Sequence, residues 1–290
     1  MINNYIFTVT AGRSGQATLY DILQRYSQGC LSDFEAPRIN TIFPSFLGDI
    51  EKIIRRKFVE TNELLGRGQI ITAYDESKNS YIENIAKIRL SKIESQAIKT
   101  NAHTYFDVSK FYARGLHIGF NNILNEFSLV LLVRDPLLNM RSFLNRNKDF
   151  FLDNSRPDSI NNILQMNSKN FSKGEFYLWS WSEIFLRYIR MCHSKKVKKS
   201  VIIKNDDLRD SAKISKVFDY LNVSHKPIDK INILNTNIEL GIESTKVKKE
   251  DILVLKKFIS RIPSKHLNDL KYMINSLQTH EKIFREDKNT

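Results

Sequence analysis

Short apolar runs alternate with amphipathic stretches along most of this chain. Runs rich in β-branched and aromatic residues predict strands at residues 5–9, 31–34, 103–109, 127–133 and 200–204. Stretches with apolar residues at helical spacing predict helices at residues 17–26, 113–125, 175–193 and 210–221. Near-continuous apolar strands separated by helices are typical of a parallel sheet that is covered on both faces. The pattern therefore predicts an α/β fold with three layers around a central parallel sheet.

Three longer segments interrupt this alternation. Residues 36–100 have mostly helical periodicity and are too long for a simple crossover, which predicts an inserted layer of helices. Residues 145–173 are rich in Asn, Asp and Ser and have weak periodicity, as in a mobile loop or lid. Residues 226–290 predict a loop and then helices, mainly over 249–277, that pack on the core. Because no internal repeat is visible, we expect residues 1–290 to form a single domain.

The turn after the first predicted strand has the residues of an anion-binding loop. It lies in the segment TVTAGRSGQATLYDIL, residues 8–23, in which Gly12 and Gly15 permit a close approach of the backbone. Backbone amides at the start of the next helix can point at a phosphate, and Arg13 can add charge-assisted contacts. The turn lacks the Gly-Lys-Ser/Thr ending of a nucleotide triphosphatase loop. A Gly-x-x-Gly turn alone is also common as an ordinary connection between a strand and a helix. The strand before it and the helix after it strengthen the interpretation as an anion-binding loop.

A second segment, LVLLVRDPLLNMRSFL at residues 129–144, again passes from a buried strand directly into a helix. Asp135 suits the cap position and Pro136 suits the first helical turn. Ser142 lies about two turns into that helix, where its hydroxyl can reach a phosphate held by Arg134. The alternative is a surface ion pair of Arg134 and a solvent-facing Ser142. Ligands of open α/β sheets bind at the carboxyl ends of the strands, so two anion sites there indicate a ligand with two separated phosphates.

Together the two segments resemble the sulfotransferases that use 3′-phosphoadenosine 5′-phosphosulfate. Residues 13–15 (Arg-Ser-Gly) are similar to the family's loop for the 5′-phosphosulfate. Arg134-x-Pro136 with Ser142 is similar to the family's 3′-phosphate motif, at the same spacing. The resemblance extends over these motifs and the order of elements through about residue 221. It implies a P-loop-like nucleotide-binding core with helical insertions, and it makes the insertion at residues 36–100 the expected acceptor region.

The resemblance also implies which residues hold the donor and its product, adenosine 3′,5′-bisphosphate. The expected contacts come from the first loop and the second motif: Arg13, Ser14, Gly15, Gln16, Ala17, Thr18, Arg134 and Ser142. The sequence departs from the family at Gln16 and Ala17, where two hydroxyl residues are usual. Backbone amides can still hold the phosphate there, and Thr18 can supply a hydroxyl one position later. No metal is expected to be required.

Two residues are expected to perform the chemistry. Arg13 is placed to stabilise the leaving 5′-phosphate, because charge develops there during sulfuryl transfer. Glu35 follows the second predicted strand, where several sulfotransferases similarly place a glutamate, and is the expected general base. The alternative for Glu35 is an ion pair with Arg38 or a cap on the following turn. His103 is a rival base, but it lies at the amino end of its predicted strand.

Other residues are expected to lie close to this edge of the sheet. Ser109 and Lys110 follow the third predicted strand at its carboxyl end and can line the site. The segment at residues 234–245 lies where related enzymes bring a loop over the nucleotide, which suggests contacts from Asn235 or Gly241.

Charge and composition limit the remaining choices. Lys and Arg exceed Asp and Glu by 45 to 32, giving a formal charge of +13, which suits an anionic partner or a solvated lysine-rich surface. Cys30 and Cys192 are the two cysteines, and their spacing suggests neither a metal site nor a disulfide framework. No signal peptide and no run of about 18 apolar residues is visible. We therefore expect a cytoplasmic protein without a membrane span.

The sequence thus favours a sulfotransferase that acts on a hydroxyl or amine of a carbohydrate or small metabolite. A nucleotide kinase-like phosphotransferase is the second enzyme candidate, although the loop lacks the Lys-Ser/Thr that holds Mg²⁺ and the terminal phosphates. A basic nucleic-acid-binding protein is the candidate from another class, although no such motif is visible. The acceptor and the oligomeric state stay open.

Overall fold

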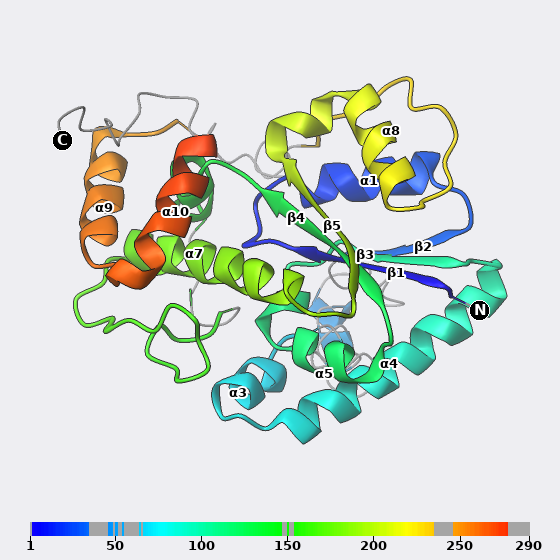
Figure 1. Cartoon of the computed structure of the whole chain (residues 1–290), viewed down its shortest axis with the longest axis horizontal. Helices are drawn as coiled ribbons and strands as arrows, with labels where there is room; N and C mark the ends of the chain where they lie inside the picture. The colour runs from blue at the N-terminus through cyan, green and yellow to red at the C-terminus, as the bar shows by residue number, and fades with distance from the viewer. Residues whose placement is uncertain are drawn as a thin grey trace.

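A parallel sheet forms the centre of the molecule. The computed structural model describes residues 2–34, 46–48, 50, 51, 54, 64, 66–146, 150, 154–234 and 246–277. The strands of the sheet are β1 (Asn4–Val9), β2 (Cys30–Asp33), β3 (Thr104–Asp107), β4 (Phe127–Val133) and β5 (Val197–Lys204). They are hydrogen-bonded in the order β2-β3-β1-β4-β5, and every pair is parallel. The predicted α/β class with a central parallel sheet is confirmed (Figure 1).

Helices cover both faces of this sheet. In chain order the described helices and 3₁₀ turns are α1 (Gln16–Tyr26), α3 (Gln69–Asp75), α4 (Asn79–Thr100), η2 (Tyr112–Arg114), α5 (Leu116–Ile123), α6 (Pro136–Leu144), α7 (Lys173–Cys192), η3 (Asn205–Arg209), α8 (Ser211–Tyr220), α9 (Lys249–Ser260) and α10 (Ser264–Leu277). Successive strand residues point to opposite faces. Ile6 accordingly packs with Leu19 of α1 and Phe218 of α8, whereas Phe7 packs with Phe120 of α5 (Figure 1).

Three predicted elements have different bounds, each for an identifiable reason. The helix predicted over residues 113–125 is divided at Gly115 into η2 and α5. The helical tail predicted over residues 249–277 is divided into α9 and α10 before Pro263, because the residue before a proline avoids helical geometry. Strand β5 begins at Val197 and so includes part of the basic run. It is an edge strand, where lysine side chains stay solvated and discourage further pairing.

The helical insertion is described only in part. Its second half is helical, as predicted, and consists of α3 and α4. The buried stripe of α4 includes Ile82, Ala86 and Ile93 but also Arg89, whose side chain is 7% exposed. Most of the stretch from 35 to 65, including the first part of the expected acceptor region, lies outside the described residues.

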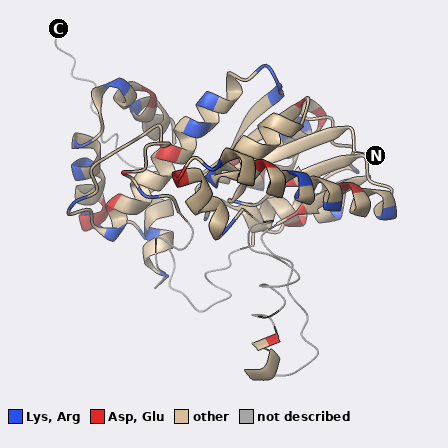
Figure 2. Cartoon of the chain, turned by 90° about the horizontal axis from the view of Figure 1, so that it is seen from below, with Lys and Arg blue, Asp and Glu red and all other residues tan. Residues whose placement is uncertain are grey.

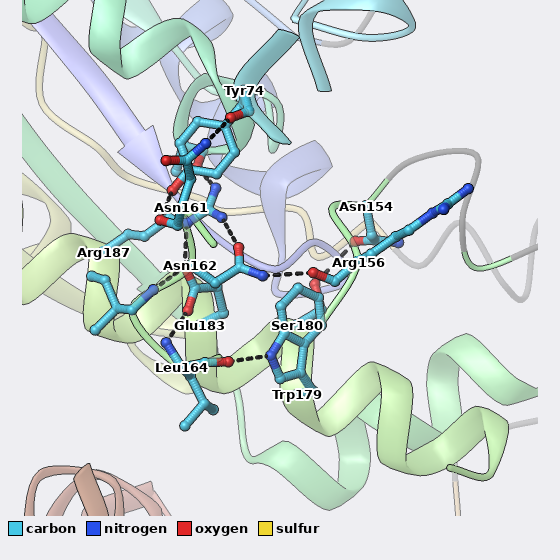
Figure 3. Close-up of polar contacts among 12 residues, drawn as sticks. Tyr74, Asn154, Arg156, Asn161, Asn162, Leu164, Trp179, Ser180, Glu183 and Arg187 are labelled. Carbon is cyan, nitrogen blue, oxygen red and sulfur yellow. Dashed lines mark hydrogen bonds and ion pairs between the residues drawn. The ribbon is translucent and has the colours of Figure 1, made fainter. Parts of the chain in front are cut away.

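The segment predicted as a mobile loop or lid is, over residues 154–172, a coil packed against α7, and the lid prediction is wrong for this part. Glu183 accepts hydrogen bonds from the backbone amides of Ile163 and Leu164 at 3.1 and 2.7 Å. Trp179 Nε1 donates to the Leu164 carbonyl at 2.8 Å (Figure 3). The polar side chains that weaken the apolar period of this segment satisfy buried backbone groups instead, as buried polar groups generally require. Trp179 and Trp181 are buried in the core.

Candidate anion-binding site

The loop between β1 and α1 has a backbone that depends on glycine. Gly12 and Gly15 have φ angles of 91° and 99°, and Arg13 between them has a φ of 60°. A Cβ atom on Gly15 would lie against Leu208 and 2.7 Å from Asn205 Nδ2, both in η3 after β5. Gly15 is therefore required both by its left-handed conformation and by the side chains of Asn205 and Leu208 beside it.

The first turn of α1 presents uncapped backbone amides. Gly15 occupies the cap position and provides no side-chain hydrogen bond, and the amide of Leu19 is the first to bond within the helix, to the Gly15 carbonyl at 3.0 Å. The amides of residues 16–18 precede that bond and have no acceptor within the helix. They carry the positive end of the helix dipole, so an anion is the ligand that suits them.

The loop carbonyl of Gly12 is held by two hydroxyl groups. Tyr177 Oη of α7 donates to it at 3.1 Å and Ser14 Oγ at 3.2 Å. Ser14 is itself held from α6, because Asn139 Nδ2 donates to Ser14 Oγ at 3.1 Å. Asn139 is fully buried, and its Oδ1 has no hydrogen-bond partner among the described residues. A free carbonyl oxygen would repel an anion. The two hydroxyl groups occupy the Gly12 carbonyl oxygen and so make the loop more suitable for a negative ligand.

Arg114 of η2 also donates hydrogen bonds to the loop and to residues beside it. One of its terminal nitrogens donates to the Ala11 carbonyl at 3.1 Å, and the other donates to Asn154 Oδ1. Its Nε donates to the Lys110 carbonyl at 3.3 Å. Lys110 lies beside the loop, since a Cβ on Gly12 would come 3.0 Å from Lys110 Cδ. The prediction that Lys110 lies at this edge is therefore confirmed.

The second motif forms the start of α6 as the sequence predicts. Asp135 Oδ1 accepts hydrogen bonds from the amides of Leu137 and Leu138 at 2.8 and 2.9 Å, and Pro136 occupies the first turn. Ser142 is 1% exposed, so the alternative of a solvent-facing serine is wrong. Its hydroxyl accepts a hydrogen bond from Arg13 Nε at 3.3 Å. The structure thus brings the two predicted anion-binding segments into direct contact.

Buried positive charge surrounds this contact. Burial raises the pKa of Tyr177, while Arg13, Arg114 and Arg134 act in the opposite direction because they favour its charged form. Burial lowers the pKa of Arg134, and the attraction of Tyr177, Asp135 and Asp206 does not restore it. A cation in this position gains from a bound anion, which would replace the solvation that it has lost.

The hydroxyl and amide side chains at the start of α1 have structural partners. Gln16 Nε2 donates to the Val108 carbonyl after β3 at 2.8 Å, so its side chain ties α1 to the sheet. Thr18 Oγ1 accepts a hydrogen bond from the Leu234 amide at 3.0 Å. This contact places the beginning of segment 234–245 at the loop, as expected. Ala17 is half-buried in the same turn.

The two candidate bases have different outcomes. Glu35 and Arg38 lie outside the described residues, as do Asn235 and Gly241. His103 precedes β3 and lies at the amino edge of the sheet, where its ring contacts Gly29 and its carbonyl accepts from the Asn3 amide at 3.0 Å. The expectation that His103 lies at the wrong end of its strand is confirmed.

A buried ion pair at the carboxyl end of β3 has no counterpart in the sequence predictions. Asp107 is fully buried and lies 2.8 Å from a terminal nitrogen of Arg89. The same nitrogen donates to Tyr105 Oη at 3.0 Å, and Tyr105 Oη donates to Asp33 Oδ2 at 2.9 Å. Arg89 on an apolar helix stripe was the available signal. Ser109 is buried beside this pair, where its amide donates to Asp107 Oδ1 at 2.7 Å.

A cavity of about 340 Å³ lies at the opposite edge of the sheet, near the start of β4. Its lining includes His117, Arg187 and Arg190. His117 is buried, and burial, followed by the charges of Arg187 and Arg190, lowers its pKa to about 3. His117 is therefore neutral at ordinary pH and serves as a packing residue.

Charge elsewhere on the described surface is mixed. Figure 2 shows Lys and Arg distributed over several helices in this view, with Asp and Glu between them. Within the described part of the chain, no three His, Cys, Asp or Glu side chains are grouped so that they could hold a metal ion. None of the described helices combines the length and apolar character needed to cross a membrane.

Comparison with known proteins finds similarity among solved structures. No family model matches the chain, and no curated protein matches it. The chain is similar to the sulfotransferase domain from the Synechococcus PCC 7002 olefin synthase, with a TM-score of 0.47 and 14% sequence identity. The similarity covers 90% of this chain and 96% of that one. At this level it does not bear on the donor or the acceptor of the present protein.

Proposed function

We propose that this protein is a sulfotransferase that moves the sulfuryl group of 3′-phosphoadenosine 5′-phosphosulfate to a hydroxyl or amine of a carbohydrate or small metabolite. The observation that carries the proposal is the hydrogen bond from Arg13 Nε to Ser142 Oγ at 3.3 Å. It joins the loop that resembles a 5′-phosphosulfate site to the helix that resembles a 3′-phosphate site. The donor carries phosphates on two positions of one ribose, which suits two neighbouring cationic segments.

The proposed reaction is a direct in-line transfer. The acceptor oxygen or nitrogen forms a bond to sulfur while the bond from sulfur to the 5′-phosphate oxygen breaks, and that oxygen takes the electron pair. Arg13 and the uncapped amides of α1 stabilise the charge on the leaving phosphate. Arg134 and Ser142 hold the 3′-phosphate. The acceptor's proton passes to Glu35, the proposed base.

A calorimetric titration with adenosine 3′,5′-bisphosphate, AMP and ATP tests the donor. We expect the bisphosphate to bind most tightly, since only it places a phosphate at both segments. Preferential binding of Mg²⁺-ATP would instead favour a phosphotransferase. Affinity for nucleic acid that falls steeply with salt, with no response to the bisphosphate, would favour the nucleic-acid-binding alternative. Turnover assayed with and without a chelator tests the prediction that no metal is required.

Replacement of the proposed base tests the chemistry. We expect Glu35→Gln to lower turnover by about 10²–10⁴-fold, because a positioned base contributes roughly that factor. Affinity for adenosine 3′,5′-bisphosphate should stay near normal. His103→Ala is the control, since His103 lies at the opposite edge of the sheet. Normal turnover in Glu35→Gln would exclude the base role, and unfolding without a selective kinetic effect would favour an ion pair with Arg38.

A further inference from the structure

Helix α7 holds the backbone of both anion-binding segments through two side chains. Tyr177 Oη donates to the Gly12 carbonyl at 3.1 Å, and Trp181 Nε1 donates to the Arg134 carbonyl at 3.2 Å. Both side chains are buried. They are four residues apart, which places them on the same face of α7, separated by about 6 Å along its axis. One rigid helix face therefore contacts the loop after β1 and the turn after β4.

The two rings are fixed by stacking on other aromatic rings. Tyr177 stacks on Phe143 of α6 with a centroid separation of 4.7 Å and an interplanar angle of 24°. Trp181 stacks on Phe185, one turn further along α7, at 6.3 Å and 28°. Each donor group is thus held in place before any ligand binds, which is the arrangement that preorganised sites require.

We propose that Tyr177 and Trp181 are positioning residues that set the separation between the two anion sites and so select a ligand with two anionic groups. The inference rests on the proposed function for the identity of that ligand. Neither side chain needs to contact the ligand. Tyr177 fixes the carbonyl beside the uncapped amides, and Trp181 fixes the residue whose guanidinium is expected to hold the second phosphate.

Phenylalanine substitutions separate the two roles. Tyr177→Phe and Trp181→Phe each remove one donor and keep an aromatic ring. Trp179→Phe is the matched control, because Trp179 Nε1 donates to the Leu164 carbonyl at 2.8 Å, away from the site (Figure 3). Trp181→Phe and Trp179→Phe lose the same hydrogen-bond donor and the same buried volume, so their general destabilisation should be similar, whereas Tyr177→Phe loses only a hydroxyl group. Thermal unfolding of each variant checks that the proteins are folded.

The expected result is a change in selectivity that depends on the position. Trp181→Phe should weaken binding of adenosine 3′,5′-bisphosphate by about 2- to 10-fold and leave AMP nearly unchanged. Tyr177→Phe should weaken both ligands, since both place a phosphate on the first loop. In the double variant the fold-loss of affinity for the bisphosphate should be smaller than the product of the two single fold-losses. The two hydrogen bonds from α7 act together as a clamp, and once either is removed the other no longer fixes the spacing. Trp179→Phe should leave the ratio of the two affinities unchanged.

Amide hydrogen exchange of the nucleotide-free protein tests the clamp independently of the ligand. We expect faster exchange at residues 12–15 in Tyr177→Phe and at residues 134, 135, 137 and 138 in Trp181→Phe, and neither change in Trp179→Phe. Equal exchange in all three variants would overturn the inference. So would a wild-type ratio of affinities in Trp181→Phe. Wild-type protein that binds AMP as tightly as the bisphosphate would refute the proposed function instead, and the exchange data would still decide whether the clamp exists.

Discussion

The two halves of helix α7 use polar side chains in opposite ways. In the first half, Tyr177 and Trp181 are neutral donors that bond to loop carbonyls. In the second half, Arg187 Nε donates to Glu183 at 2.7 Å, and both side chains are almost fully buried. The remaining donors of Arg187 contact the Ala113 carbonyl and Asn162 Oδ1, each at 2.8 Å. Glu183 and Arg187 thus neutralise each other's charge inside the protein, whereas the neutral groups of Tyr177 and Trp181 support the two loops.

The same difference is seen in the pKa values of Arg187, in the second half of α7, and of Arg134, whose carbonyl Trp181 in the first half contacts. Burial opposes the charge of Arg187, but Glu183 and Tyr74 together with the hydrogen bond to Glu183 raise its pKa above the ordinary value. Burial lowers the pKa of Arg134, where the neighbouring groups are insufficient to compensate. The charge of Arg187 is neutralised by a carboxylate inside the protein, whereas an arginine whose burial is uncompensated is suited to bind an external anion.

The largest effect on stability should come from breaking the buried ion pair of Arg187 and Glu183. Arg187→Met leaves Glu183 buried without its partner and should destabilise the protein by about 3–5 kcal/mol, measured by urea unfolding. Arg25→Met, which removes an exposed pair with Asp21, is the control and should change stability by about 0–1 kcal/mol. Similar stabilities for the two variants would mean that the buried pair is not structural.

A smaller effect, confined to ligand binding, should come from Arg134, whose carbonyl accepts the hydrogen bond from Trp181 in the first half of α7. Arg134→Ala should weaken the binding of adenosine 3′,5′-bisphosphate by about 1.5–3 kcal/mol, because a charge-assisted hydrogen bond is lost. The binding of AMP should be weakened much less. Ser142→Ala should act in the same direction. Calorimetric titration with both nucleotides measures the effect, and Arg25→Ala controls for the loss of one positive charge. Equal losses for the two nucleotides would place Arg134 away from the 3′-phosphate.

A pH dependence of stability should come from His117 of α5, which lies beside Arg187 and Arg190 in the second half of α7. The pKa of His117 is lowered to about 3 in the folded protein, next to Arg187 and Arg190 of α7, Tyr74 of α3 and Tyr112 of η2. Between its unfolded pKa and this value only the unfolded chain binds the proton, so stability should fall as pH falls through that window. The slope is about 1.4 kcal/mol per pH unit for one proton.

Removal of the imidazole tests this pH dependence. His117→Asn should flatten the decline in stability between about pH 6 and pH 4, measured by urea unfolding across that range. His193→Asn, at an exposed position, is the control and should retain the wild-type slope. An unchanged slope in His117→Asn would assign the acid sensitivity to other groups.

The elements that apolar periodicity defines were predictable from the sequence. The strands, the helix that begins at Asp135 and the contact between the two anion motifs follow from local patterns and from the rule that parallel strands end at one edge. Loop bounds and helix breaks near Gly115 and Pro263 were less exact, because a single residue decides them.

The residues that support the site could not be read from the sequence. Tyr177, Arg114 and Asn139 lie on three different elements, and only the packing of those elements brings them to the loop. The packed coil at residues 154–172 was mistaken for a lid because its polar side chains, such as Asn161 and Asn162, bond to backbone carbonyls rather than to solvent. Glu183 of α7 in turn accepts from its backbone amides. Tertiary hydrogen bonds of this kind leave no periodic signal.

The bond between Tyr177 and Gly12 also constrains how the protein is made. It joins residues 165 positions apart, and the strands on both sides of β1 are synthesised long after it. A ribosome adds roughly 5–20 residues per second, so the nascent loop exists for many seconds without its support. Until β3 and β4 have been synthesised, β1 is an unpaired apolar strand, which is a target for chaperones and for aggregation. Chains truncated before α7 are consequently expected to lack a preformed anion site, although they contain both motifs.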